Sequence, residues 1–259
     1  MIVTHSCDQP ATRLPNTALS GVQVVSETHC REFTVYEARI GALQTVSLRS
    51  PDDQACVHFY YFISGSGKCE GKGGKGDHYT VGPDQVVALS SDMTRTLATE
   101  VAMRVLVVYY PDADGAFKSL ELVRSLPELV GSERDIGCDT MSSRRFVIKR
   151  DGFPLGIHNT WLRSMTSSRL EYKNHIESVY FLTGKVTYHW QDGNGQWTSE
   201  TSKIDESNGT NFLMNIHDKH IVESHDEGAI CICIFDPVLT GEESHHLSDD
   251  GFSSYDAMP

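Results

Sequence analysis

The chain has no long apolar run, and none of its 259 residues lies in a stretch approaching the ~18 that a membrane-spanning helix requires. Its first residues show neither a basic start nor an apolar segment, so we expect no secretory signal and a cytoplasmic location. Positive charge is also scarce, with 22 Lys and Arg against 35 Asp and Glu and a formal net charge of −13. Because an acidic chain repels phosphate groups, we expect neither nucleic acid nor a membrane as a partner.

Cysteines with a zinc-binding spacing are absent. The seven cysteines are odd in number and scattered, which predicts free thiols in a reducing compartment. Helical periodicity is nearly absent too, since only residues 114–130 place apolar side chains near helical spacing. Pro127 lies inside this stretch, so we expect a short or broken helix that connects two halves of the chain.

Strand signals dominate the rest of the sequence. Runs rich in Val, Ile, Phe and Tyr alternate with clusters of Gly, Pro, Asp and Ser. The expected strands are 34–36, 44–48, 57–63, 85–89 and 103–110 in the first half, and 145–149, 160–163, 178–183, 186–190, 211–215 and 229–235 in the second.

The two halves of the chain resemble each other. Residues 60–65 (Tyr-Tyr-Phe-Ile-Ser-Gly) match 179–184 (Val-Tyr-Phe-Leu-Thr-Gly), and 107–111 match 233–237. Short strands in a repeated pattern predict an all-β chain of two tandem double-sheet jelly rolls. The expected domains are residues 1–125 and 126–259. Two unrelated β domains, or one larger sandwich, are the alternatives.

Three side chains in the second half indicate chemistry. Glu177 begins an expected strand, and His217 and His220 follow another. Small β-barrels bind ligands inside, where a carboxylate and an imidazole are costly to bury unless they are paired or bound to a metal. Spacing alone leaves the metal open, because His-x-x-His also occurs on exposed turns and the intervening Asp218 and Lys219 are charged.

Six motifs of the second half follow one another in a recognisable order. They lie at 143–145, 149–152, 172–180, 209–210, 217–220 and 235–245. In this order and spacing, residues 138–255 resemble the ectoine synthase family of cupins. The resemblance implies a hydro-lyase that uses an iron ion to close N-γ-acetyl-L-2,4-diaminobutyrate into the cyclic osmolyte ectoine with loss of water.

The resemblance also implies roles for individual residues. The implied ligands of Fe(II), or of another divalent metal, are Glu177 and His220. The implied catalytic residues are Tyr172, Glu243 and His245. The implied substrate-binding residues are Arg145, His158, Thr160, Cys233 and Phe235. These residue types suit the reaction, because a metal polarises an amide carbonyl, an arginine grips a carboxylate, and an acid and a base move protons. Which residue is acid and which is base stays open.

Three positions depart from the family's pattern. Phe212 stands where a tyrosine completes the iron site, Met141 replaces a tryptophan, and His158 replaces a pocket asparagine. We hypothesise that His158 takes the place of the lost phenol beside Glu177 and His220. The alternative is an ordinary partly buried histidine.

Other predicted site residues also have plainer interpretations. Glu177 can cap a strand with its carboxylate in solvent, and Glu243 and His245 can belong to a polar tail. Phe235 is core in either case. Of Cys231 and Cys233, we expect one to face inward as a small core residue and one to face outward.

The first half retains no ligand set of this kind. By the internal match, His58 and Arg95 stand where Glu177 and His220 stand. We therefore expect residues 1–125 to form a degenerate cupin with a structural role. It would act as the second half of a pseudo-dimer, in place of the partner in a homodimer. A ligand of its own is the alternative.

These observations predict an ectoine-synthase-like hydro-lyase that acts on a small molecule. Met141 and His158 occupy positions at which the resemblance places the substrate. One alternative is therefore a cupin enzyme for a different small amino-acid or osmolyte substrate. Because Phe212 has no donor atom, the other alternative is a non-catalytic bicupin that binds a metabolite.

Overall fold

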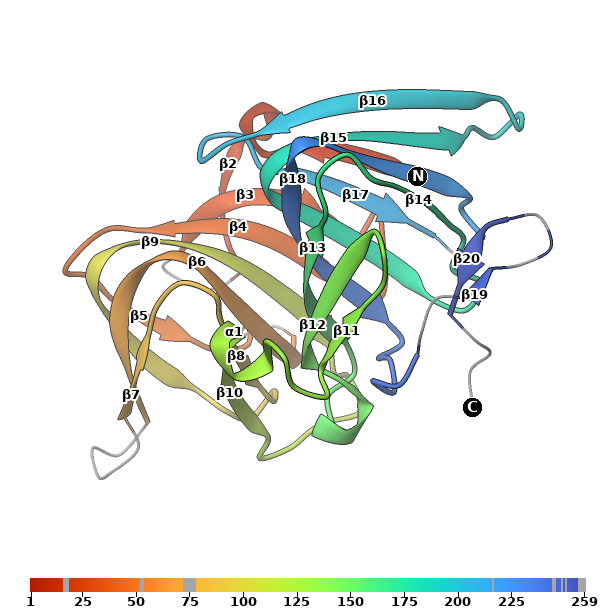
Figure 1. The fold of residues 1–259 in the computed structure, drawn as a ribbon. Coiled ribbons are helices and arrows are strands. Elements are labelled where there is room, and N and C mark those ends of the chain that lie inside the picture. The colour runs from red at the N-terminus through yellow and green to blue at the C-terminus, as the bar shows by residue number, and fades with distance from the viewer. Residues whose placement is uncertain are drawn as a thin grey trace. The chain divides into compact units, whose positions relative to one another are not determined.

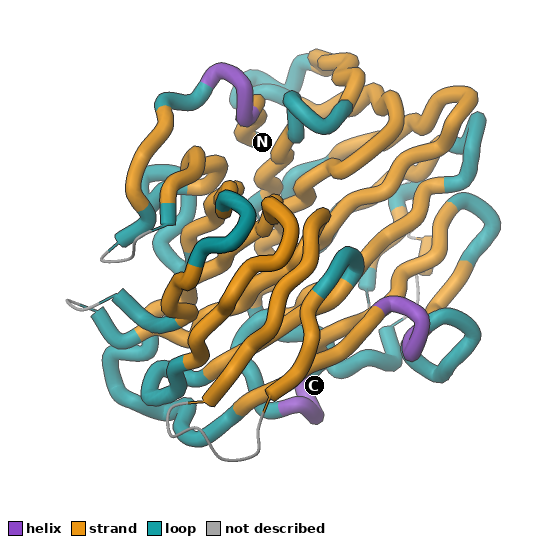
Figure 2. The backbone as a smooth tube through the Cα atoms, turned by 90° about the vertical axis from the view of Figure 1, so that its left-hand side faces the viewer, coloured by secondary structure: helices purple, strands orange, loops and turns teal. Residues whose placement is uncertain are grey.

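In a computed structural model, the described residues are 1–15, 19–51, 54–71, 78–215, 217–243, 246–247, 249 and 251–255. Strands make up most of this backbone, as Figure 2 shows. No helix in these ranges is long and apolar enough to cross a bilayer. All seven cysteines fall within them and are free.

The chain divides into two compact units. The N-terminal unit comprises Asp8–Glu128 and Asp151–Phe153, and the C-terminal unit comprises Met1–Cys7, Leu129–Arg150 and Pro154–Pro259. This differs from a division at residue 125 mainly at the N-terminus. There the first strand pairs within the C-terminal unit rather than within its own half.

The N-terminal unit is a single nine-stranded sheet folded on itself, in the order β10-β8-β6-β9-β4-β3-β2, with β5 beside β9 and β7 beside β6. Its strands are β2 (Ala11–Arg13), β3 (Ser20–Val25), β4 (Thr34–Ile40), β5 (Thr45–Leu48), β6 (Cys56–Gly71), β7 (His78–Val81), β8 (Gln85–Leu89), β9 (Arg95–Pro111) and β10 (Glu121–Ser125).

The C-terminal unit repeats the same path, in the order β1-β17-β15-β18-β13-β12-β11, with β14 beside β18 and β16 beside β15. Its strands are β1 (Ile2–His5), β11 (Asp135–Gly137), β12 (Met141–Val147), β13 (Gly156–Leu162), β14 (Ser167–Leu170), β15 (Ile176–Gln191), β16 (Trp197–Ile204), β17 (Thr210–Met214), β18 (His220–Asp236), β19 (His246–Leu247) and β20 (Ser253–Ser254). The repeated strand order confirms the predicted tandem jelly rolls.

The two units also agree in strand register. The pairings of β6 with β9 and of β15 with β18 equate His58 with Glu177. The pairings of β5 with β9 and of β14 with β18 equate Arg95 with His220. The internal match of the sequence therefore identifies equivalent positions in the two sheets.

Long bent strands shape the interior of the C-terminal unit. Register shifts in β15 between Phe181 and Thr183, and between Gly184 and Val186, bend the strand as β-bulges do. Gly184 has φ 99°, and a Cβ there would lie 2.2 Å from the carbonyl oxygen of Gly228. These bends let β15, which is long and curved in Figure 1, carry side chains from its two ends around one interior.

The segment 114–130, expected to hold a short or broken helix at the connection of the two halves, is helical only over its last few residues. Residues Glu121–Ser125 form β10, which pairs antiparallel with β8, and only Leu126–Leu129 form the helix α1. Edge pairing with β8 satisfies the backbone polar groups of this segment, so tertiary context overrides a weak local propensity. Two 3-10 turns, Ser6–Asp8 and Lys149–Asp151, complete the described helical structure.

Candidate active site

A cavity lies inside the C-terminal jelly roll and opens to solvent. The predicted site residues that line it are Thr160, Tyr172, Glu177, Cys233 and Phe235. They come from β13, β15 and β18 and from the segment that precedes β15. The cavity is otherwise mainly apolar, as small-molecule sites usually are.

Glu177 is the acidic residue of the cavity. It lies at the start of β15, is 4% exposed, and is hydrogen-bonded to the thiol of Cys233. Burial raises the pKa of Glu177 well above its ordinary value, and Cys233 raises it further. The plain interpretation of Glu177 as a solvent-facing strand cap is therefore wrong.

His220 is the basic counterpart, at the first position of β18 and 1% exposed. Its Nδ1 lies 2.8 Å from the backbone oxygen of Asp218, so this nitrogen carries the proton and donates it. Its Nε2 is buried and has no hydrogen-bond partner among the described residues. Burial lowers the pKa of His220 to about 4, so the ring is neutral at pH 7 and its free lone pair is on Nε2.

Two tyrosines connect Glu177 with His220. The ring of Tyr188 stacks on that of His220 with centroids 5.8 Å apart, and the ring of Tyr172 lies 6.2 Å from it. Burial, with Glu177 as a further cause, raises the pKa of both phenols well above the ordinary value. Glu177 and His220 therefore adjoin the same pair of phenols in one interior.

These residues fit a divalent cation. A metal-ligating histidine typically donates one ring N–H to a carbonyl and offers the other nitrogen to the metal, and His220 has this arrangement. A carboxyl and an imidazole are also the donors that iron accepts. Within the described ranges, however, no three His, Cys, Asp or Glu side chains lie close enough to hold a metal together. The hypothesised set of Glu177, His158 and His220 is therefore not assembled.

His158 lies behind the cavity wall rather than in it. It is fully buried on β13, its Nδ1 is 3.2 Å from Oγ of Ser143, and its ring packs 5.2 Å from that of Phe235. Burial, and next the charge of Arg145, lower its pKa well below the ordinary value. Ser143 lines the cavity and separates it from this neutral ring.

Arg145 and Glu243 bind each other. Arg145 is 1% exposed, donates to the backbone oxygen of Glu243 at 2.6 Å, and forms an ion pair with its carboxylate at 3.4 Å. Neither residue lines the cavity. Arg145 was predicted to bind a substrate carboxylate, but in the structure it binds a carboxylate of the chain itself.

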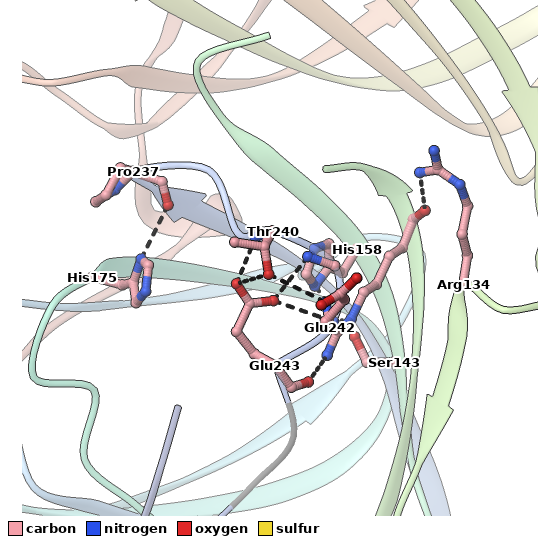
Figure 3. A network of polar contacts seen from close by, with 10 residues as sticks. Arg134, Ser143, His158, His175, Pro237, Thr240, Glu242 and Glu243 are labelled. Carbon is pink, nitrogen blue, oxygen red and sulfur yellow. Dashed lines mark hydrogen bonds and ion pairs between the residues drawn. The ribbon is translucent and has the colours of Figure 1, made fainter. Parts of the chain in front are cut away.

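The turn after β18 holds this carboxylate in place. Glu243 accepts hydrogen bonds from the backbone and hydroxyl of Thr240 and from the N–H of Gly241, and Figure 3 shows the contacts between Thr240 and Glu243. Burial raises the pKa of Glu243, but these hydrogen bonds outweigh it and lower the pKa overall. Glu243 is ionised at pH 7 and so is no proton donor. The third predicted catalytic residue, His245, lies outside the described residues.

Cys231 and Cys233 both face the cavity, with their sulfur atoms 4.0 Å apart. The expectation that one faces outward is wrong, because residues two apart in a strand share a face. Cys233 also lies 3.4 Å from the hydroxyl of Thr160. Its pKa is raised well above the ordinary value by Cys231 and by burial, so it is a neutral thiol.

Sequence reasoning missed two tyrosines of the cavity. Tyr255 stacks on Tyr172 with ring centroids 4.9 Å apart, and nothing in its polar surroundings in the sequence signals this contact. Tyr188 lies an odd number of residues after Glu177, so uninterrupted alternation along β15 would place it on the opposite face; the register shifts between them bring both side chains to the same cavity.

Comparisons with known proteins relate the C-terminal half of the chain to one family. The family model described as ectoine synthase matches residues 121–256. The L-ectoine synthase of Desulfosudis oleivorans is 33% identical over 137 residues, which are 53% of this chain and 98% of that protein. The L-ectoine synthase of Oceanobacillus iheyensis is 32% identical over 130 residues, or 50% of this chain and 94% of that protein.

Solved structures resemble the whole tandem arrangement. The formate complex of oxalate decarboxylase from Lactobacillus farciminis has a TM-score of 0.70 at 8% identity, covering 92% of this chain and 87% of that chain. Oxalate decarboxylase from Bacillus subtilis at pH 4.6 has a TM-score of 0.64 at 11% identity, covering 99% and 77%. At such low identity this likeness shows the bicupin fold alone. With the family match covering more than half of its residues, the chain belongs to the ectoine synthase family.

Proposed function

We propose that the C-terminal unit is a metal-dependent hydro-lyase that closes N-γ-acetyl-L-2,4-diaminobutyrate into ectoine. The observation that carries the proposal is a buried carboxyl in the cavity, Glu177, together with the unpartnered Nε2 of His220, whose ring stacks on Tyr188 in the cavity wall. The family relationship of residues 121–256 supports the choice of substrate.

The reaction requires proximity and proton transfer. The substrate amine attacks its own amide carbonyl carbon, a C=N bond forms, and the carbonyl oxygen leaves as water with two protons, which balance those lost from nitrogen. A cavity that holds the flexible substrate in a ring-like pose supplies part of the barrier reduction, up to about 7–11 kcal/mol for well-oriented groups. A divalent metal held by Glu177 and His220 supplies polarisation of the carbonyl when bound.

Tyr172 is the proton donor that this proposal favours. Its phenol lines the cavity, and burial keeps its pKa well above the ordinary value, so it is protonated and able to assist a poor leaving group. Thr160, Cys233 and Phe235 form the wall around the reacting atoms. Arg145 can bind the substrate only if the substrate carboxylate displaces the carboxylate of Glu243 from its guanidinium.

We also propose that residues 1–125 have a structural role. His58 bonds through Nδ1 to the hydroxyl of Tyr60 at 3.1 Å, and Arg95 forms an ion pair with Glu121. The positions equivalent to Glu177 and His220 are thus used in internal contacts of the N-terminal unit. This unit would take the place of a partner subunit, giving a pseudo-dimer within one chain.

Product analysis tests the proposed reaction. Full-length protein loaded with Fe(II) is mixed with N-γ-acetyl-diaminobutyrate, and ectoine is measured by mass spectrometry. We expect product from the wild type and none from Glu177→Gln, which keeps the size of the side chain and removes its charge. Metal-loaded wild type that forms no ectoine rejects the reaction. Turnover of another compound in a panel of small amino-acid amides would then identify a different substrate.

A further inference from the structure

Tyr188 has an unusual position between two rings of the C-terminal unit. Its ring stacks on Phe212 with centroids 4.1 Å apart and planes 14° from parallel, and on His220 at 5.8 Å and 17°. It is 2% exposed, yet it lines the cavity. A tyrosine clamped in this way has one orientation, so its hydroxyl has a defined place.

The surroundings of this hydroxyl are those of the candidate metal site. Glu177, Cys231 and Cys233 line the same cavity as Tyr188. The stacked neighbour His220 contributes the unpartnered Nε2. The phenol therefore borders both Glu177 and His220.

We infer that Tyr188 supplies the third protein donor, its phenolic oxygen, to a metal held by Glu177 and His220. This inference rests on the proposed function, which places a metal in the cavity. A catalytic metal centre commonly has three protein ligands and an open position for substrate. Within the described residues, His, Cys, Asp and Glu side chains do not complete such a set, and a phenol is the donor type still available.

Other candidates for the third donor are less well placed. The hydroxyl of Tyr172 is hydrogen-bonded to Tyr255, on whose ring Tyr172 also stacks. His158 lies behind Ser143. Phe212 has no donor atom, although its ring lies directly against that of Tyr188. A tyrosine at position 188 therefore places its phenol one ring away, in the same stack, from where a tyrosine at position 212 would place it.

Iron spectroscopy tests the assignment. Full-length protein is loaded with Fe(II), the bound iron is oxidised to Fe(III) in air, and visible absorption is recorded, because a phenolate bound to ferric iron gives a charge-transfer band. The variants are Tyr188→Phe, the matched control Tyr172→Phe from the same cavity, and the exchange Tyr188→Phe with Phe212→Tyr. Each keeps the aromatic ring, and thermal unfolding checks that each is folded.

We expect the wild type and Tyr172→Phe to show the band. Tyr188→Phe should lose it and bind iron at least about tenfold more weakly, the smallest effect expected when a group that supports a metal is lost. The exchange variant should regain band and affinity. Wild type with stoichiometric iron but no band, or a band that survives in Tyr188→Phe, overturns the inference while ectoine formation still decides the reaction. Wild type that takes up no iron overturns the inference and the metal-dependent reaction together.

Discussion

Replacing Glu243 with glutamine removes a charge beside a buried guanidinium and keeps the size of the side chain. Arg145 is 1% exposed, so solvent cannot take over from the lost carboxylate. Breaking a buried ion pair costs about 3–5 kcal/mol, and a hydrogen bond to a charged group contributes about 1.5–3 kcal/mol. The backbone oxygen of Glu243 at 2.6 Å still accepts from Arg145, so we expect a loss near the lower limit, about 2 kcal/mol.

Tryptophan fluorescence is suited to measuring this loss. All three tryptophans, Trp161, Trp190 and Trp197, belong to the C-terminal unit, so urea unfolding followed by fluorescence reports on that unit. Glu133→Gln is a matched control in the same unit, because the ion pair of Glu133 with Arg150 is exposed on both sides. Exposed pairs contribute at most about 1 kcal/mol.

The loss should also depend on pH in a defined direction. The folded pKa of Glu243 is lowered from 4.5, so its carboxylate contributes stability above pH 4.5, and this contribution disappears as pH falls through the lowered value. The difference between wild type and Glu243→Gln should therefore be full at pH 7 and shrink in acid. Equal unfolding free energies for Glu243→Gln and Glu133→Gln at pH 7 would refute this account of the Arg145 pair.

Three further outcomes are expected. His158→Asn should leave the iron stoichiometry, measured by metal analysis, unchanged because His158 lies behind Ser143. Loss of iron in this variant would show that His158 is a metal ligand. Arg95→Met should destabilise the N-terminal unit by about 1.5–3 kcal/mol in calorimetry, since Glu121 loses its cationic partner and keeps only the hydroxyl of Tyr79, without lowering ectoine formation. Gly184→Ala should cost more than about 2 kcal/mol in fluorescence-detected unfolding, because φ is 99° and the new Cβ meets a backbone oxygen; a smaller cost would show that β15 relaxes easily.

Much of the fold was readable from local patterns. Period-two alternation, turn residues and the repeat of 60–65 at 179–184 predicted tandem jelly rolls, and the equivalence of His58 with Glu177 is reproduced in strand register. The extent of the helix in 114–130 was overestimated, because its apolar spacing also suits an edge strand once β8 offers backbone partners. Pairing with a strand far along the chain is not visible in a local window.

The sequence by itself determined only which near neighbours of an unbulged strand share a face, because alternation is a property of the backbone, and the expectation for Cys231 and Cys233 misapplied that rule. On that rule Glu177 and Val179 share a face, as do Cys231 and Cys233. Only the tertiary structure decided which of these inward side chains meet. Bulges bend β15 until Tyr188 stacks on His220 of β18, and a turn delivers the Glu243 carboxylate to Arg145. Such encounters depend on the curvature of the sheet and on contacts between residues distant in sequence, neither of which a strand's own pattern encodes.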